Sequence, residues 1–262
     1  MNNLGKNFEI TAKNVQTYIE EISEWIFHFL SDSHRNGAVF GLSGGVDSAV
    51  VARLVQTSGM PFTALLMPNG DGVYCRQPND FTDAKDLVMT FGFDYRVIDI
   101  SVICTATTLL ASDPIVQAAR VNDQKLARIN IAPRIRADIL YQIGQLQRRS
   151  VIGTSNLSEI VTGYFTKYGD NAYDLNPLGF MTKREVYILA KALGIPARII
   201  AKPPSAGLYE GQTDETELGF SYDNVDDWIL YGSSGDSGID AKIKARFALS
   251  AHKRTSPSIF IG

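Results

Sequence analysis

The sequence predicts an α/β fold in which helices flank a doubly wound parallel sheet. Short apolar runs alternate along the chain with longer segments whose apolar residues recur every three or four positions. Glycine-containing turns follow two of the apolar runs, at 41–48 and 153–156. Strands that alternate with helices indicate a parallel sheet with right-handed crossovers. The 262 residues are 45% hydrophobic, which is enough for the core of a single domain spanning 1–262.

The individual elements follow from periodicity and from the residues that end each run. The first helix is expected at 14–33, because apolar residues there have helical spacing: Val15, Tyr18, Ile19, Ile22, Trp25, Ile26 and Phe29. Apolar runs predict strands at 37–42, 62–67, 95–100 and 150–154. Further helices are expected from the first strand's loop to about residue 58, and at 80–91, 122–147 and 182–193. Pro133 implies a break or kink, while Thr182 and Gly194 are ordinary start and stop signals.

The most informative segment is the glycine-rich loop between the first strand and its helix. It comprises Gly41, Leu42, Ser43, Gly44, Gly45, Val46, Asp47 and Ser48. Glycines let the backbone approach a ligand closely, and the free N–H groups at the start of a helix attract anions. The loop differs from a P-loop because no lysine closes it. We therefore predict that it cradles the phosphates of a nucleotide.

Asp47 indicates that this nucleotide is bound together with a metal ion. A carboxylate is favourable in the first turn of a helix, but beside a triphosphate it would repel the ligand unless a cation lay between them. Magnesium prefers one or two carboxylates together with phosphate oxygens. For such a loop in isolation, the alternative is an ordinary tight turn with a capping aspartate.

Longer strings extend this prediction through a resemblance to known families. Residues 43–48 resemble the SGGxDS signature of the N-type ATP pyrophosphatases, which split ATP between its α and β phosphates. From Arg134 onward the chain resembles the ammonia-dependent NAD synthetases. The matching strings are GTSN at 153–156, Glu159, GYFTKYGD at 163–170, Asp174, TK at 182–183, KPPSA at 202–206, DETELG at 214–219 and HKR at 252–254. The resemblance implies an adenine nucleotide alpha-hydrolase-like, Rossmann-like fold.

The resemblance also implies roles for individual residues. Asp47 and Glu159 would hold magnesium, and together with Lys183 they would form the catalytic group. Beyond the glycine-rich loop, the ATP contacts would be Thr154, Lys183 and Ser205. The residues that bind deamido-NAD would be Arg134, Lys167, Asp174, His252 and Lys253.

The implied reaction converts deamido-NAD to NAD in two steps. AMP is first transferred from ATP to the nicotinate carboxylate with release of pyrophosphate, and ammonia then attacks the acyl adenylate. Free ammonia is the expected nitrogen donor, with any glutaminase on a separate chain. The resemblance also implies a homodimer, for which segment 122–147 and its stripe of Leu140, Ile143 and Leu146 form the candidate interface.

Several positions depart from the family pattern. Leu66 lies where the family usually has an arginine that contacts adenine, and Asn171, Ala172 and Tyr173 replace a usual Gly-Gly-Ala. Two alternatives therefore stay open. One is a diverged ATP pyrophosphatase that amidates or adenylates another carboxylate, and the other is a non-catalytic nucleotide-binding protein.

Composition excludes some other classes. The net charge of −3 supplies no field for holding nucleic acid. The first residues lack an apolar signal region, and no apolar run approaches the ~20 residues of a membrane span, so we expect a cytoplasmic protein. The segment 202–216, rich in proline and glycine, is expected to be a flexible loop.

Overall fold

A computed structural model describes residues 6–70, 78–108, 113–205, 213–257 and 259–260. Its centre is a sheet of four parallel strands in the order β3-β2-β1-β4. The strands are β1 (Ala38–Gly41), β2 (Phe62–Leu66), β3 (Tyr95–Val97) and β4 (Ser150–Val151). The predicted α/β class is confirmed, and each strand lies within its expected run.

The strand order fixes where a ligand can enter the sheet. From β1 the chain proceeds outward to β2 and β3, and then returns to place β4 on the other side of β1. Ala38 pairs with Phe62 on one side and with Ser150 on the other. The connections after β1 and β4 therefore diverge at the carboxyl edge, and such a switch point is where open α/β sheets bind ligands.

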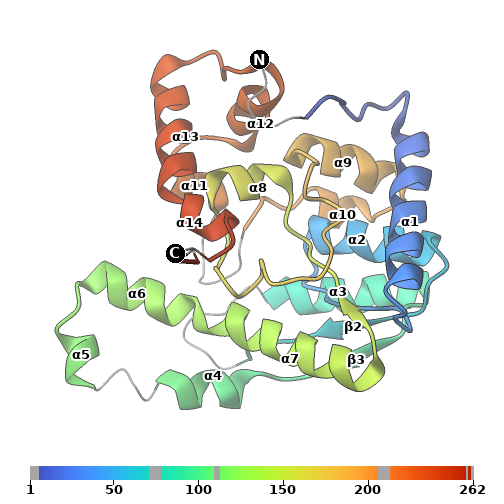
Figure 1. The fold of residues 1–262 in the computed structure, drawn as a ribbon, viewed down its shortest axis with the longest axis horizontal. Coiled ribbons are helices and arrows are strands. Elements are labelled where there is room, and N and C mark those ends of the chain that lie inside the picture. The colour runs from blue at the N-terminus through green and yellow to red at the C-terminus, as the bar shows by residue number, and fades with distance from the viewer. Residues whose placement is uncertain (1–5, 71–77, 109–112, 206–212, 258, 261–262) are drawn as a thin grey trace.

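Helices cover both faces of the sheet (Figure 1). Ala38 and Phe40 belong to the larger core, which also contains the apolar sides of α1 (Val15–Asp32), α2 (Val46–Thr57), α3 (Pro78–Phe91), α9 (Lys183–Ala192) and α10 (Ala197–Ile200). Val39 alternates to the opposite face, where α4 (Ser101–Thr108) and α7 (Ile131–Gln147) complete a second core. Burial on both faces explains why the central strands β1 and β2 are almost continuously apolar, whereas the edge strand β3 is partly exposed.

The predicted break in segment 122–147 occurs just before the proline. Two helices, α6 (Val121–Ile129) and α7, meet at Asn130. Pro133 lies in the first turn of α7, where a missing N–H costs no hydrogen bond. A short helix, α5 (Pro114–Gln117), precedes them.

The C-terminal part of the chain forms a separate helical layer against the carboxyl edge of the sheet. Figure 1 shows these helices gathered beside α8. The layer consists of α8 (Leu157–Thr162), α11 (Asp214–Leu218), α12 (Tyr222–Tyr231), α13 (Ser237–Leu249) and α14 (Ala251–Arg254). Their shared core includes Leu157, Val161, Trp228 and Ile243.

The segment 202–216 only partly fits the expected loop. Residues 206–212 lie outside the described residues, and α11 begins at Asp214 behind a Thr213 cap. Among the described helices, none combines the length and the hydropathy needed to cross a membrane.

Candidate active site

A cavity of about 1080 Å³ opens at the carboxyl edge of the sheet. Its walls come from the loops that follow β1, β2 and β4, from the loop after α8, and from the first turn of α9. The C-terminal layer closes the far side through Asp214, Glu217, Arg246 and Lys253. Segments that are remote in sequence therefore meet at the switch point of the sheet.

The glycine-rich loop lines this cavity and is held by its own serines. The Ser43 N–H donates to Ser48 Oγ at 3.2 Å, and the Gly45 N–H donates to Ser43 Oγ at 3.2 Å. The Ser48 hydroxyl donates to the Gly45 carbonyl at 3.1 Å. Helix α2 then begins at Val46, so its first N–H groups are presented at the end of the loop.

Gly44 is required by the path of this loop. Its φ is +86°, a region that residues with a side chain rarely adopt. A Cβ atom at this position would also lie 2.1 Å from the carbonyl oxygen of Asp80. The loop therefore packs directly on the start of α3, and glycine permits both the conformation and the approach.

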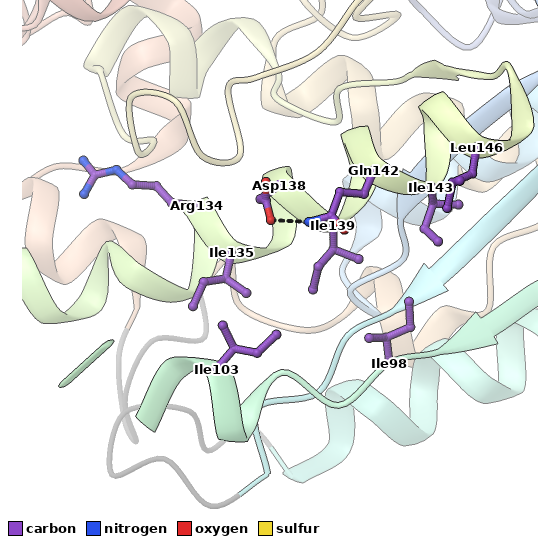
Figure 2. A pocket seen from close by; sticks show the side chains of 9 residues that line it. All are labelled: Ile98, Ile103, Arg134, Ile135, Asp138, Ile139, Gln142, Ile143 and Leu146. Atoms are coloured by element: carbon purple, nitrogen blue, oxygen red, sulfur yellow. Dashed lines mark hydrogen bonds between the residues drawn. The ribbon is translucent and has the colours of Figure 1, made fainter. Parts of the chain in front are cut away.

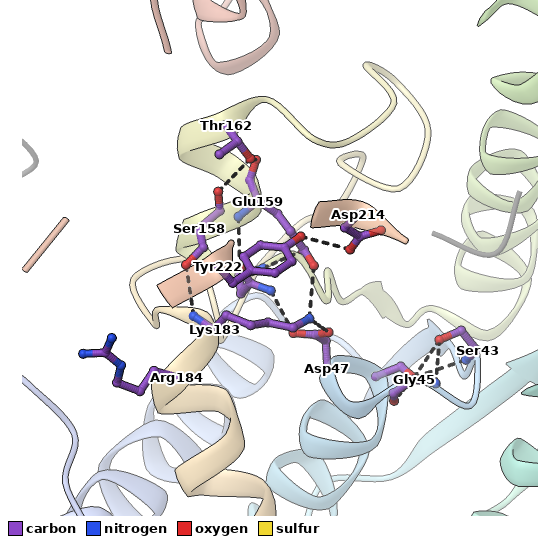
Figure 3. Close-up of polar contacts among 12 residues, drawn as sticks. Ser43, Gly45, Asp47, Ser158, Glu159, Thr162, Lys183, Arg184, Asp214 and Tyr222 are labelled. Atoms are coloured by element: carbon purple, nitrogen blue, oxygen red, sulfur yellow. Dashed lines mark hydrogen bonds and ion pairs between the residues drawn. The ribbon is translucent and has the colours of Figure 1, made fainter. Parts of the chain in front are cut away.

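Three charged side chains meet beside the loop (Figure 3). Lys183 Nζ lies 2.6 Å from Asp47 Oδ2 and 3.5 Å from Glu159 Oε1. The three residues come from the first turns of α2, α8 and α9. The sequence predicted all three as the catalytic group, and the fold brings them into direct contact across 136 positions of chain.

The electrostatics of this trio explain its protonation. Burial, followed by the charge of Asp47, raises the pKa of Glu159 to about 8, although Lys183 pulls it down. Burial alone would lower the pKa of Lys183, but Asp47 and Glu159 raise it above its ordinary value. Lys183 is therefore a firmly charged ammonium, while Glu159 readily carries a proton unless another cation joins the site.

The trio has supporting residues to which sequence reasoning assigned no role. Asn156 Nδ2 donates to Asp47 Oδ1 at 2.9 Å, and the same side chain forms a capping box with Glu159. The ring of Tyr222 lies 5.3 Å from Lys183 Nζ, and its hydroxyl donates to Asp214 Oδ2 at 3.0 Å. The Asn-x-x-Glu capping spacing was a readable signal for Asn156; the sequence offered none for Tyr222.

Most of the other residues predicted to contact ATP line the same cavity. They include Thr154 after β4 and Ser205 after α10, as well as the glycine-rich loop apart from Gly44. Lys253, predicted to contact deamido-NAD, also lines it, and its Nζ donates to the carbonyls of Gly163 and Phe165 at 2.8 Å each.

The remaining four residues predicted for deamido-NAD are not among the residues that line this cavity, and Arg134 lines the groove between α4 and α7 instead. Lys167 Nζ donates to the His252 carbonyl at 2.6 Å, which joins the 163–170 loop to α14. Arg134 is exposed on α7, with Nε 3.4 Å from the Lys167 carbonyl. Asp174 accepts a hydrogen bond from the Val151 N–H at 2.8 Å at the edge of the sheet.

The structure accommodates three of the four departures from the family pattern, whereas Asn171 Oδ1 is buried and has no hydrogen-bond partner among the described residues. The ring of Tyr173 packs against Gly153, where an added Cβ would lie 2.3 Å from the ring. Ala172 lines the cavity, and Tyr173 joins the apolar cluster between the sheet and α7. Leu66 is buried and lines the cavity, so this position has an apolar contact in place of an arginine.

The donor set at this site fits a magnesium ion. Asp47 and Glu159 present two carboxylates from separate helices to one ammonium, beside a loop suited to phosphates. Magnesium is usually bound by one or two carboxylates, with phosphate oxygens and water completing the shell. No group of three or more histidine, cysteine or acidic side chains with metal-binding geometry occurs within the described residues.

The chain is similar in sequence to known proteins. Residues 18–257 match the model of the NAD synthase family. The NH(3)-dependent NAD(+) synthetase of Finegoldia magna is 39% identical, with 92% of this chain and 94% of that protein covered. That of Archaeoglobus fulgidus is also 39% identical, over 94% of this chain and 97% of that protein.

Solved structures show the same similarity. An NMN synthetase from Francisella tularensis superposes with a TM-score of 0.84 at 36% identity, covering 96% of this chain and 99% of that one. An NH3-dependent NAD synthetase from Campylobacter jejuni superposes with a TM-score of 0.74 at 31% identity, covering 94% and 99%. The chain belongs to the NAD synthase family.

Proposed function

We propose that this chain is an ATP-dependent ligase that amidates deamido-NAD with ammonia to form NAD. The observation that carries the proposal is the contact of Asp47, Glu159 and Lys183 beside the glycine-rich loop in one cavity. Sequence identity of 39% to two NH(3)-dependent NAD(+) synthetases over more than nine tenths of the chain supports the same reaction.

The residues suit the two chemical steps. The loop from Gly41 to Ser48 would hold the ATP phosphates, while Lys183 would neutralise charge that develops as pyrophosphate leaves. Asp47 and Glu159 would hold magnesium, which supplies charge stabilisation at the phosphates. Because the substrate's carboxylate attacks the α-phosphate, the protein need only position and stabilise.

Thr154 and Ser205 complete the proposed ATP contacts. The dinucleotide carries two phosphates and a carboxylate, so its site needs several cations. Arg134, Lys167 and Lys253 would supply them, with Asp174 and His252 as polar partners. The Lys167–His252 contact and the bonds of Lys253 support this grouping, because they bring α14 to the 163–170 loop.

The test is product analysis with the purified chain. ATP, magnesium, ammonium and deamido-NAD are expected to give NAD, AMP and pyrophosphate in equal amounts, and EDTA is expected to stop the reaction. Glutamine in place of ammonium should support no turnover. Pyrophosphate release without amide formation would contradict the proposal, as would turnover with glutamine alone.

A second candidate substrate is nicotinate mononucleotide. The similarity to the Francisella tularensis NMN synthetase favours it, since that structure superposes with a TM-score of 0.84 against 0.74 for the Campylobacter jejuni enzyme. Both substrates present the same nicotinate carboxylate to ATP, and they differ by one AMP unit. The ratio of kcat/KM for the two acids decides between them.

We also propose that the protein is a homodimer that associates through α4 and α7. A groove of about 470 Å³ runs between these helices and is lined by isoleucines together with Arg134, Asp138 and Gln142, and Leu146 at its end is 81% exposed (Figure 2). Leu140, expected in the same stripe, lines the active-site cavity instead. A second copy would cover this apolar surface. Sedimentation analysis should give a dimer for the wild type and a monomer for Leu146→Glu. The control Leu249→Glu, equally exposed on α13, should remain dimeric.

A further inference from the structure

Helix α9 begins with two cations, although the start of a helix disfavours positive charge. Lys183 occupies the first position and Arg184 the second. The structure places a buried carboxylate, Asp226 of α12, against their backbone N–H groups. This contact compensates for the two cations and also joins three elements of the site.

Asp226 bonds to two of these elements directly. Its Oδ2 accepts the Arg184 N–H at 2.7 Å, and its Oδ1 accepts the Ser158 hydroxyl at 2.5 Å. Ser158 Oγ in turn accepts the Lys183 N–H at 3.0 Å. Ser158 directly precedes Glu159 in α8, so the Asp226 carboxylate connects the backbones that carry Glu159 and Lys183.

Helix α12 contacts both the ammonium group of Lys183 and the backbone beside it. Tyr222 and Asp226 are four residues apart and therefore share a face of the helix. The Tyr222 ring lies near the Lys183 ammonium, while Asp226 reaches the backbone at the start of α9. The orientation of Lys183 is thus fixed by α12 as well as by its own helix.

The chemistry of this position requires a carboxylate. Asp226 is fully buried, and burial raises its pKa to about 6, while bonds from Ser158 and Arg184 hold it down. It is therefore ionised at neutral pH and accepts from both sides. An asparagine would keep one acceptor oxygen but present an NH2 donor in place of the other, so one of the two donors, the Ser158 hydroxyl or the Arg184 N–H, would lose its acceptor unless the Ser158 hydroxyl turned away.

We propose that Asp226 is a positioning residue that holds Glu159 and Lys183 in register through Ser158 and the start of α9. It touches neither substrate nor metal in this assignment, and it acts through the two residues that do. The inference rests on the proposed function, because that function assigns magnesium binding to Glu159 and charge neutralisation to Lys183.

The test is a double-mutant cycle read by two measurements, MgATP affinity and steady-state kinetics. Asp226→Asn and Ser158→Ala are each expected to weaken MgATP binding and to lower kcat by about tenfold, as hydrogen bonds to charged groups typically do. The double variant should lose little more than the worse single variant, because both changes break one connection. Asp227→Asn is the control, since Asp227 lies on the same helix but bonds only the Arg184 side chain among the contacts described, at 2.8 Å.

The outcomes test the positioning role of Asp226 separately from the proposed amidation reaction. Wild-type affinity and kcat in folded Asp226→Asn would overturn the positioning role, as would losses in the double variant that multiply. If Asp226→Asn does not fold, Ser158→Ala alone carries the test, and unchanged MgATP affinity there overturns the inference. A wild type that binds MgATP but forms no amide refutes the proposed function, while the affinities of the variants still test Asp226.

Discussion

Replacing Lys183 with methionine removes the ammonium from between Asp47 and Glu159 while keeping most of the side chain's packing. The lysine is 4% exposed, and its partners are 18% and 17% exposed. At an effective dielectric constant of about 20, the attraction of Lys183 to Asp47 at 2.6 Å is about 6 kcal/mol, and its attraction to Glu159 at 3.5 Å is about 5 kcal/mol when Glu159 is ionised. Desolvation of the ammonium offsets much of this, and removing one partner from a buried pair typically costs about 3–5 kcal/mol.

The cost should depend on pH because Glu159 can take up a proton. Its pKa is raised from 4.5 to about 8, so the stability that this group contributes is present below pH 4.5 and is lost as the pH rises through about 8. Lys183 lowers this pKa, and its removal therefore deepens the loss at high pH. We expect the variant to lose about 1–2 kcal/mol at low pH and about 3–5 kcal/mol at high pH.

Urea denaturation in EDTA, followed by tryptophan fluorescence at pH 5.5, 7 and 9, measures this difference. Added magnesium should restore part of the stability at pH 9, because a divalent cation would replace the ammonium between the carboxylates. Lys191→Met is the matched control on the same helix, since Lys191 is exposed in its last turn. A loss below 1 kcal/mol at every pH, or one larger at pH 5.5 than at pH 9, would refute the reasoning.

Two further substitutions test the buried Lys6–Glu185 ion pair and the path of the glycine-rich loop. Lys6→Met should lower the free energy of unfolding by about 3–5 kcal/mol, because it leaves Glu185 without its ionic partner at 3.1 Å in a fully buried position. Urea denaturation measures this loss, with Lys13→Met at an exposed position as the control. Equal losses in the two variants would contradict the prediction. Gly44→Ala should weaken MgATP binding at least tenfold in equilibrium dialysis, because the added Cβ meets α3. Gly59→Ala, with a similar positive φ of +75° but nothing within 4 Å of the added atom, should cost stability of only about 1–2 kcal/mol and leave that affinity unchanged.

Local patterns were sufficient for the sheet and for part of the site. The four strands lie within the runs that predicted them, and α9 begins directly after the capping residue Thr182. Such features depend on neighbours in the chain, which periodicity and capping residues report directly. Thr213 is a capping residue of the same kind, and its side chain caps α11 within the segment that was expected to be a loop.

The sequence by itself determined the fold class, the glycine-rich loop and, through its resemblance, the trio of Asp47, Glu159 and Lys183. Only the tertiary structure decided how that trio is held. The Ser158–Asp226 contact joins residues 68 positions apart, and the Lys6–Glu185 pair joins the segment before α1 to the first turn of α9. No local pattern encodes such contacts, because they form only when separate helices pack and bury polar groups that must then find partners.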